Sequence, residues 1–204
     1  MPRIVSIGEA LVEIMRPGRD QPLDRPGEFL GPYPSGAPAI FADAAARLGA
    51  DVGFVGAVGQ DPFGDCILDR LMWDGIDCSA VGRAPERLTG IAFVAYHTDG
   101  SRRFLFHLAD SAAAMVAPEQ VPEAYLADTR VLHVTGSALT FGTSLRETCY
   151  RAARLVHAHG GRVSLDPNLR PELMPVDEIR AICAPILELA EVILPSGDEA
   201  TTLT

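Results

Sequence analysis

The chain of 204 residues is 48% hydrophobic and 22% charged, a composition typical of a globular protein that buries a sizeable core. Its 27 acidic and 17 basic residues give a formal net charge of −10, which disfavours nucleic acid and anionic membranes as partners, since both select basic surfaces. All 17 basic residues are arginines. The absence of lysine excludes a Walker-type phosphate loop and a Schiff-base lysine.

The N-terminal sequence and the cysteines both favour a cytoplasmic protein. Residues 1–5 lack the charged head and apolar stretch of a secretory signal, and uncharged runs such as 111–118 are too short to cross a membrane. The cysteines are widely spaced and form no Cys-x-x-Cys pair. We therefore expect reduced, mostly buried thiols at Cys66, Cys78, Cys149 and Cys183.

The N-terminal segment predicts a strand, an irregular stretch and a helix. A β-branched run over residues 3–8 indicates a buried strand. The many prolines and glycines between residues 15 and 34 exclude a helix there and leave short edge strands at 11–15 and 28–30. A helix follows Ser35 and ends at Gly49. Its expected buried face comprises Ile40, Phe41, Ala44, Ala45 and Leu48.

The middle of the chain interrupts the alternation of strands and helices. Residues 52–59 predict a strand and residues 61–73 a helix. Two β-like runs, 90–97 and 102–108, then flank the turn pair Asp99-Gly100, which is a strong hairpin signal. Paired strands inserted into a strand–helix alternation predict a flap beside the main sheet.

Regular alternation returns in the last third. Strands are expected at 130–134, 162–165 and 192–194. Between them lie a helix opened by the capping box Ser144–Glu147 and a second helix over 177–189. Residues 196–199 look like the start of one more helix. Strands alternating with helices of this length predict an α/β fold, a mostly parallel sheet flanked by helices.

Polar residues cluster where the predicted strands end. Asp166, Asn168 and Arg170 offer an acceptor, an amide and a fork-shaped cation, a set that can orient a hydroxylated ligand; the first two fit an Asx turn equally well. His133 falls within a strand, where a hydrogen-bonded core histidine is the usual case. The pair Gly56 and Gly59 lacks the third glycine of a dinucleotide fingerprint.

Taken together, the motifs resemble the ribokinase-like (PfkB) carbohydrate kinase family. The order and spacing agree over nearly the whole chain, which resembles about the first two-thirds of a family member. The matching segments are residues 7–13, 35–39, 46–50, 54–64, 75–77, 89–90, 166–170 and 194–199. Each segment is weakly specific, whereas the set is very specific.

The resemblance implies a Rossmann-like core and a small β lid made of two insertions. The core would comprise residues 1–14, 35–89 and 109–204, and the lid residues 15–34 and 90–108. In the family, sugar binds between core and lid, and lid closure keeps water from competing for the transferred phosphate. ATP and Mg²⁺ are the implied cofactors. A homodimer through the lid is the implied assembly, since exposed strand edges pair readily.

The resemblance also assigns candidate site residues. Glu13 stands where the family places an acidic residue that binds sugar hydroxyls. The implied substrate-binding residues are Glu13, Ser35, Gly36, Ala37, Phe106, Asn168 and Arg170. Asp166 and Glu199 would organise phosphate and Mg²⁺ without binding the metal directly.

Four departures from the family pattern stand out. Ile40 replaces an asparagine that reads a sugar hydroxyl, Ser35 replaces the first glycine of a pair, and Ser196 replaces the asparagine of the Asn-x-x-Glu motif. The family's Gly-Ala-Gly-Asp segment, which supplies the catalytic base, has no match here and is expected beyond Thr204. No catalytic residue is therefore assigned within this chain.

Within the family, residues 34–41 and 103–112 are most similar to tagatose-type ketohexose kinases and to 2-keto-3-deoxygluconate kinases. His107 and Leu108 stand where a sugar acid would need a cation, which favours a neutral ketose such as tagatose or fructose. A sugar-acid kinase and a truncated, non-catalytic sugar-binding or dimerisation module remain alternatives. A nicotinamide oxidoreductase needs a glycine fingerprint after the first strand, where the chain has Gly8-Glu9-Ala10-Leu11.

Overall fold

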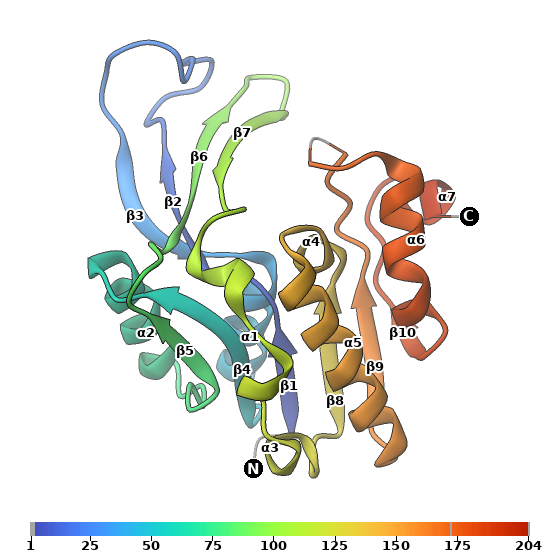
Figure 1. Ribbon diagram of the computed structural model, residues 1–204. Coiled ribbons are helices and arrows are strands. Elements are labelled where there is room, and N and C mark those ends of the chain that lie inside the picture. The colour runs from blue at the N-terminus through green and yellow to red at the C-terminus, as the bar shows by residue number, and fades with distance from the viewer. Residues whose placement is uncertain (1–2, 172, 204) are drawn as a thin grey trace.

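A computed structural model describes residues 3–171 and 173–203 and shows a large and a small sheet (Figure 1). The large sheet has the order β10–β9–β8–β1–β4–β5, and every neighbouring pair in it is parallel. Its strands are β1 (Ile4–Ile7), β4 (Val52–Gly59), β5 (Val81–Ala84), β8 (Val131–Thr135), β9 (Arg162–Asp166) and β10 (Ala190–Ile193). The predicted α/β fold with a mostly parallel sheet is confirmed.

Helices cover both faces of the large sheet (Figure 1). The four long ones are α1 (Ala37–Arg47), α2 (Pro62–Trp73), α5 (Thr143–Ala158) and α6 (Val176–Leu187). The short ones are α3 (Glu123–Leu126), α4 (Gly136–Thr140), α7 (Glu199–Leu203) and the 3₁₀ turns η1 (Ala112–Met115) and η2 (Pro118–Gln120). Alternate residues of β4 point to opposite faces: Phe54 packs with α1 and α2, and Val55 joins the core beneath α5 and α6.

The strand order reverses at the centre of the large sheet. From β1 the chain proceeds through α1 to β4, and from β8 it proceeds through α5 to β9 on the opposite side. Helices that diverge from two neighbouring strands leave a crevice at the strands' carboxyl ends, where open α/β sheets bind ligands. Gly8-Glu9 and Gly136-Ser137 follow directly on these two strands.

The small sheet stands above the carboxyl ends of the large one (Figure 1) and combines the two inserted regions. Its strands are β2 (Leu11–Met15), β3 (Leu30–Ser35), β6 (Gly90–Tyr96) and β7 (Arg102–His107), in the order β3–β2–β6–β7. Strands β2 and β6 pair in parallel, and the outer pairs are antiparallel. The small sheet thus takes in residues 11–14, which the sequence analysis placed in the core.

Three local predictions differ from the structure. The expected edge strand at 28–30 instead runs from Leu30 to Ser35, because an edge strand tolerates Pro32 and Pro34. Gly142, rather than Ser144, is the N-cap of α5, and the Ser144 hydroxyl donates to the Val116 carbonyl. The short strand β5 was not predicted at all, since four residues give little periodicity.

The predicted buried face of α1 is wrong. Pro38, Ala39 and Ala42 are the buried residues of this helix, whereas Ile40 is 53% exposed and Leu48 is 89% exposed. Small side chains face the sheet because they let the helix axis approach it closely, which leaves the larger ones on the outside. Periodicity alone placed the apolar stripe on the side with the bulkier residues.

The cysteines were predicted to be reduced and mostly buried. Cys149 and Cys183 are buried, while Cys66 and Cys78 are only half-buried, and all four are unpaired thiols. Within residues 3–171 and 173–203, no helix has the length and apolarity needed to cross a membrane.

Candidate functional site

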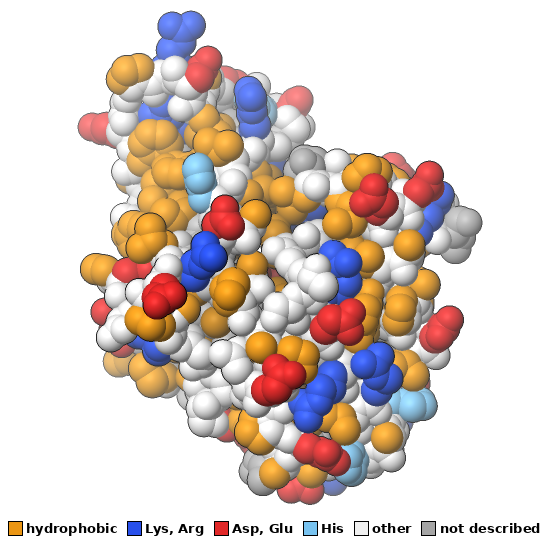
Figure 2. Space-filling view, viewed as in Figure 1, with side chains coloured by type: hydrophobic (Ala, Val, Ile, Leu, Met, Phe, Trp, Pro, Cys, Tyr) orange, Lys and Arg blue, Asp and Glu red, His pale blue; other side chains and the backbone are white. Residues whose placement is uncertain are grey.

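A cavity of about 370 Å³ lies between the two sheets, and we call it the inter-sheet cavity. The space-filling view shows the molecule hollowed between the small sheet and the C-terminal elements (Figure 2). Every site residue expected from the sequence except Glu199 lines this cavity. These residues are Glu13, Ser35, Gly36, Ala37, Phe106, Asp166, Asn168 and Arg170. Segments separated by more than a hundred positions in the sequence therefore meet at one place.

The wall formed by the small sheet carries an oriented carboxylate. Glu13 on β2 lies beside β3, and the Ser35 hydroxyl donates to Glu13 Oε1 at 2.9 Å. A carboxylate has about four lone-pair positions, so one serine leaves Glu13 with acceptor capacity for a ligand hydroxyl. Ser35, which departs from the family's glycine, thus holds the acidic side chain in place.

Gly36 lets two chain segments cross at the edge of the inter-sheet cavity. It is the N-cap of α1 and has φ +107, a left-handed conformation that favours glycine. A Cβ atom at this position would lie 2.5 Å from the Glu9 carbonyl oxygen. Its small size therefore brings the start of α1, including Ala37, against the segment that leaves β1.

Asp166, Asn168 and Arg170 form the opposite wall. The backbone amide of Asn168 donates to Asp166 Oδ1 at 3.0 Å, so the Asx turn considered from the sequence is present. The same residues also line the cavity. Asn168 has φ 38, and its Oδ1 is buried without a hydrogen-bond partner. Burial, together with the nearby Glu199, raises the pKa of Asp166. A strained asparagine with an unused acceptor is typical of a ligand site.

Glu199 lies outside the inter-sheet cavity but supports its wall. Its Oε1 accepts from the Leu169 amide at 2.8 Å, and its Oε2 accepts from the Ser196 amide at 2.7 Å and from the Ser196 hydroxyl at 3.0 Å. Ser196, where the family has asparagine, is thus part of this arrangement. The carboxylate ties the turn after β9 to the turn after β10.

Aromatic rings line the cavity beside these polar groups. Phe104 and Phe106 on β7 stack with ring centres 5.1 Å apart, and Phe106 lies 6.3 Å from Phe141, which follows α4. Across the cavity Phe41 stacks on His133 at 3.6 Å. Flat apolar surfaces of this kind suit the C–H faces of a polyol, while the carboxylates and arginines take its hydroxyls.

His133 fits the prediction of a hydrogen-bonded core histidine and also contributes to the cavity. It is 2% exposed, and its Nδ1 lies 3.2 Å from the Ser164 hydroxyl. Burial lowers its pKa to about 4, so the ring is neutral near neutral pH. Its position in β8, one of the two strands at which the strand order reverses, was the sequence signal that this histidine could also line the cavity.

Two charged residues of the cavity were assigned no role by the sequence analysis. Glu9 follows Gly8 at the carboxyl end of β1, and its Oε1 accepts from the Ser137 hydroxyl at 2.8 Å. Arg102 begins β7, and its guanidinium lies 5.2 Å from the Phe104 ring centre. A glutamate directly after the first strand could have been noticed. The role of Arg102 depended on strand register, which the sequence does not define.

The fold and site define a class of protein: a doubly wound α/β domain with a cavity between its switch point and a second sheet, lined by groups that suit a small hydroxylated ligand. The sequence matches the pfkB family carbohydrate kinases over residues 1–204, and the chain belongs to that family. Its architecture is the ribokinase-like fold, as the agreement with solved structures shows.

Individual relatives agree with this assignment. The fructokinase of Salmonella typhimurium is 34% identical over 194 residues, covering 95% of this chain and 60% of that protein. A structure described as a putative Ribokinase II from E. coli, in its apo form, matches with a TM-score of 0.93 and 40% identity, covering 100% of this chain and 65% of that one. A second structure of that description, in complex with ATP and Mg²⁺, matches with a TM-score of 0.92. The chain thus spans about 60% of the length of its first curated relative.

Proposed function

We propose that this chain is the sugar-binding part of an ATP-dependent carbohydrate kinase that phosphorylates a hydroxyl of a ketohexose such as fructose or tagatose. The inter-sheet cavity carries the proposal, because it gathers carboxylates, an amide, arginines and aromatic rings around a space of about 370 Å³. Relatives described as fructokinases in Salmonella typhimurium and Arabidopsis thaliana support fructose as the substrate.

The residues of this chain bind and orient the sugar. Glu13, held by Ser35, accepts hydrogen bonds from sugar hydroxyls on one side, while Asn168 and Arg170 contact the sugar and the phosphate region from the other. The small sheet serves as a lid, residues 15–34 and 90–108 in the division made from the sequence. Closure over the sugar excludes water, which otherwise competes as acceptor of the phosphate.

The residues around Asp166 and Glu199 fit ATP with Mg²⁺. Both oxygens of Glu199 already accept hydrogen bonds, so it suits contact with a hydrated ion better than direct ligation. Burial raises the pKa of Asp166, and the neighbouring carboxylate of Glu199 raises it further. Two carboxyl groups so close together leave a place for positive charge. Mg²⁺–ATP supplies the phosphoryl group and neutralises its charge during transfer. The base that activates the sugar hydroxyl is assigned to no residue of this chain.

A 2-keto-3-deoxygluconate kinase is the second candidate, and Arg102 favours it. This arginine lines the inter-sheet cavity, and among the described residues it forms no ion pair with an acidic side chain. The sequence analysis looked for the cation at His107 and Leu108, on the other end of β7. A guanidinium in a sugar pocket binds a carboxylate in a bidentate manner.

We further propose a homodimer through the small sheet and a cytoplasmic location. Phe29 and Leu105 are 38% and 50% exposed there, and β3 and β7 are edge strands with unpaired backbone groups. The four unpaired cysteines suit a reducing compartment. Sedimentation at several concentrations tests the dimer; a monomer at all concentrations contradicts it.

Calorimetry and an ADP-release assay together test the function. The chain is titrated with fructose, tagatose and 2-keto-3-deoxygluconate, and the same sugars are supplied with Mg²⁺–ATP. We expect a ketohexose to bind at least about tenfold tighter than the acid, and Glu13→Gln to weaken binding about tenfold. Preference for the acid that is lost in Arg102→Gln establishes the second candidate.

The remaining outcomes are equally informative. Because no catalytic base is assigned to this chain, sugar binding without ADP release is the expected result both for part of a kinase and for a sugar-binding module, the third possibility raised by the sequence. No binding of any of the three sugars overturns the proposed function. Folding of each variant is checked by circular dichroism, so that lost binding is not confused with lost structure.

A further inference from the structure

Glu9 is a buried carboxyl group at the junction of the two sheets. It lies between β1 of the large sheet and β2 of the small sheet, and the residue is 3% exposed. It is one of the residues that line the inter-sheet cavity. The roles that the family resemblance implies do not include this residue.

One of the two carboxyl oxygens is satisfied and the other is not. The Ser137 hydroxyl donates to Glu9 Oε1 at 2.8 Å, and the Ser137 oxygen in turn lies 2.9 Å from the Thr135 hydroxyl. Glu9 Oε2 is buried and has no hydrogen-bond partner. Buried polar atoms without partners are rare in native proteins and call for an explanation such as a ligand.

The surroundings of Glu9 leave its charge state finely balanced. Burial raises its pKa to about 7, and the Ser137 hydroxyl, the backbone amides of Glu9 and Ala37, and the charge of Arg170 oppose that rise. Because its pKa lies close to neutral pH, a small change in hydrogen bonding decides whether the carboxyl is ionised.

Other titratable groups near Glu9 do not compete with it. Cys149 on α5 also faces it, but burial raises the pKa of that thiol far above neutral, so it carries no charge. His133, with a pKa of about 4, is neutral as well. Arg102 and Arg170 are the cationic side chains that line the cavity. The remaining cavity acids are Glu13 and Asp166.

We propose that Glu9 is a further sugar-binding residue, whose Oε2 accepts a hydrogen bond from a hydroxyl of the bound sugar, and that sugar binding expels the carboxyl proton. This inference rests on the proposed function. The O–H bond of the neutral carboxyl breaks, the proton passes to the buffer, and no other bond changes. The ligand is thus a polyol. Glu9 is about half protonated at neutral pH before the sugar binds, and it contacts the bound sugar in its ionised form.

The first test measures proton release. Fructose is titrated into the chain by calorimetry in two buffers of different ionisation enthalpy, and the difference gives the protons exchanged. With the ionised form of Glu9 binding the sugar about tenfold tighter than the neutral acid, a group whose pKa is about 7 before binding releases about 0.4 proton per sugar at pH 7 and about the same at pH 6. Affinity then rises with pH until about pH 7 and levels off above it.

Two variants and one control make the test specific. Glu9→Gln is expected to release no proton, to bind about tenfold more weakly than wild type at pH 8.5, and to match it at pH 5.5. Ser137→Ala keeps the acid but removes its donor, so the midpoint of the pH dependence moves upward. Glu13→Gln is the matched control, which binds more weakly but still releases the proton.

The outcomes separate this inference from the proposed function. Sugar binding by the wild type without proton release overturns the inference and leaves the function standing. Proton release that persists in Glu9→Gln also overturns it. If Glu9→Gln fails to fold, Ser137→Ala decides, because an unmoved midpoint contradicts the role of Glu9. A wild type that binds no sugar overturns both.

Discussion

The strands of the two sheets differ in how deeply they are buried, and this difference gives the two sheets different roles at the cavity. All eight residues of β4 in the large sheet are buried, whereas in β7 of the small sheet no residue is fully buried. The large sheet is packed on both faces and forms a fixed floor. The small sheet covers the cavity with a less buried layer, which suits an element that moves.

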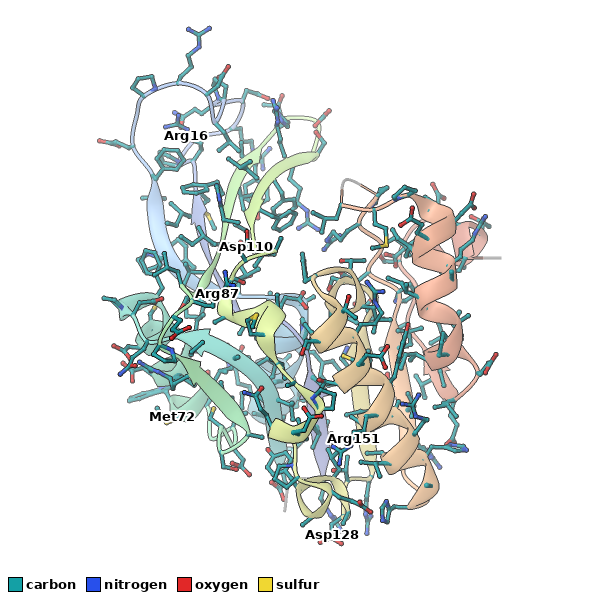
Figure 3. The ribbon with its side chains drawn as sticks, viewed as in Figure 1. Arg16, Met72, Arg87, Asp110, Asp128 and Arg151 are labelled. Carbon is teal, nitrogen blue, oxygen red and sulfur yellow. The ribbon has the colours of Figure 1, made fainter. Side chains whose placement is uncertain are left out.

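Chain segments cross at the junctions between the two sheets, and specific contacts hold these crossings in place. Gly36 allows one close crossing, and Asp61 fastens another by accepting from the Thr89 amide and hydroxyl, both at 2.8 Å. At the same level Arg87 and Asp110 form an ion pair at 3.8 Å (Figure 3). Contacts at these crossings therefore set the position of the small sheet over the cavity.

The largest expected effect compares one leucine from each sheet. Leu132 on β8 is fully buried, and Leu132→Ala should lower the free energy of unfolding by about 2–5 kcal/mol. Leu105 on β7 is 50% exposed, and Leu105→Ala should cost less than about 1 kcal/mol. Urea denaturation of both variants measures the difference. Equal losses would show that the small sheet contributes to global stability as the core does.

A smaller effect is expected at the Asp61 crossing. Burial raises the pKa of Asp61, but hydrogen bonds from Thr89, Gly64 and Phe63 outweigh it and hold that pKa below the ordinary value of 3.8. The carboxylate therefore stabilises the fold above pH 3.8, and this stabilisation is lost as the pH falls through the lowered pKa. Asp61→Ala should cost about 2 kcal/mol at pH 7.

Urea denaturation at pH 7 and below pH 4 measures this effect, which should shrink at the lower pH. Asp65→Ala is the matched control: Asp65 lies on the same helix, and its side chain is 60% exposed in an ion pair with Arg83. It should cost less than about 1 kcal/mol. A similar loss of stability in both variants would mean that the effect comes from removing an acidic side chain at helix α2, and not from the contact between Asp61 and Thr89.

The smallest effect is confined to the tip of the small sheet. Arg16 is buried in the loop that joins β2 and β3 (Figure 3), donates to the carbonyls of Pro22, Arg25 and Glu28, and lies 4.0 Å from the Phe29 ring centre. Lysine is a point charge and cannot span three carbonyls. Arg16→Lys should speed hydrogen exchange of amides 17–28 about tenfold and change global stability by less than about 1 kcal/mol.

Hydrogen exchange followed by mass spectrometry measures this loop directly. Arg19→Lys is the control, because Arg19 is exposed and its side chain forms no hydrogen bond with any other residue that the structure describes. Unchanged protection of residues 17–28 in Arg16→Lys would contradict the role of the arginine as the anchor of the loop.

Much of the site was predictable because the family motifs sit at strand ends. Asp166, Asn168 and Arg170 were found from their position after a strand, and Gly36 from the family resemblance. Glu9 was missed because a single glutamate after a strand carries no sign of burial. Its unusual pKa arises from the packing of four separate elements, which no local pattern records.

The sequence by itself determined the α/β class, the strand–helix order and the family, since hydrophobic periodicity, turn residues and motif spacing are local properties. Only the tertiary structure decided which side of α1 packs on the sheet, that β2 leaves the core, and that Arg102 reaches the cavity. These features depend on the distance between helix and sheet and on the register between strands remote in the chain. Both are set by how the whole molecule packs, because each contact there involves residues that are not neighbours in sequence.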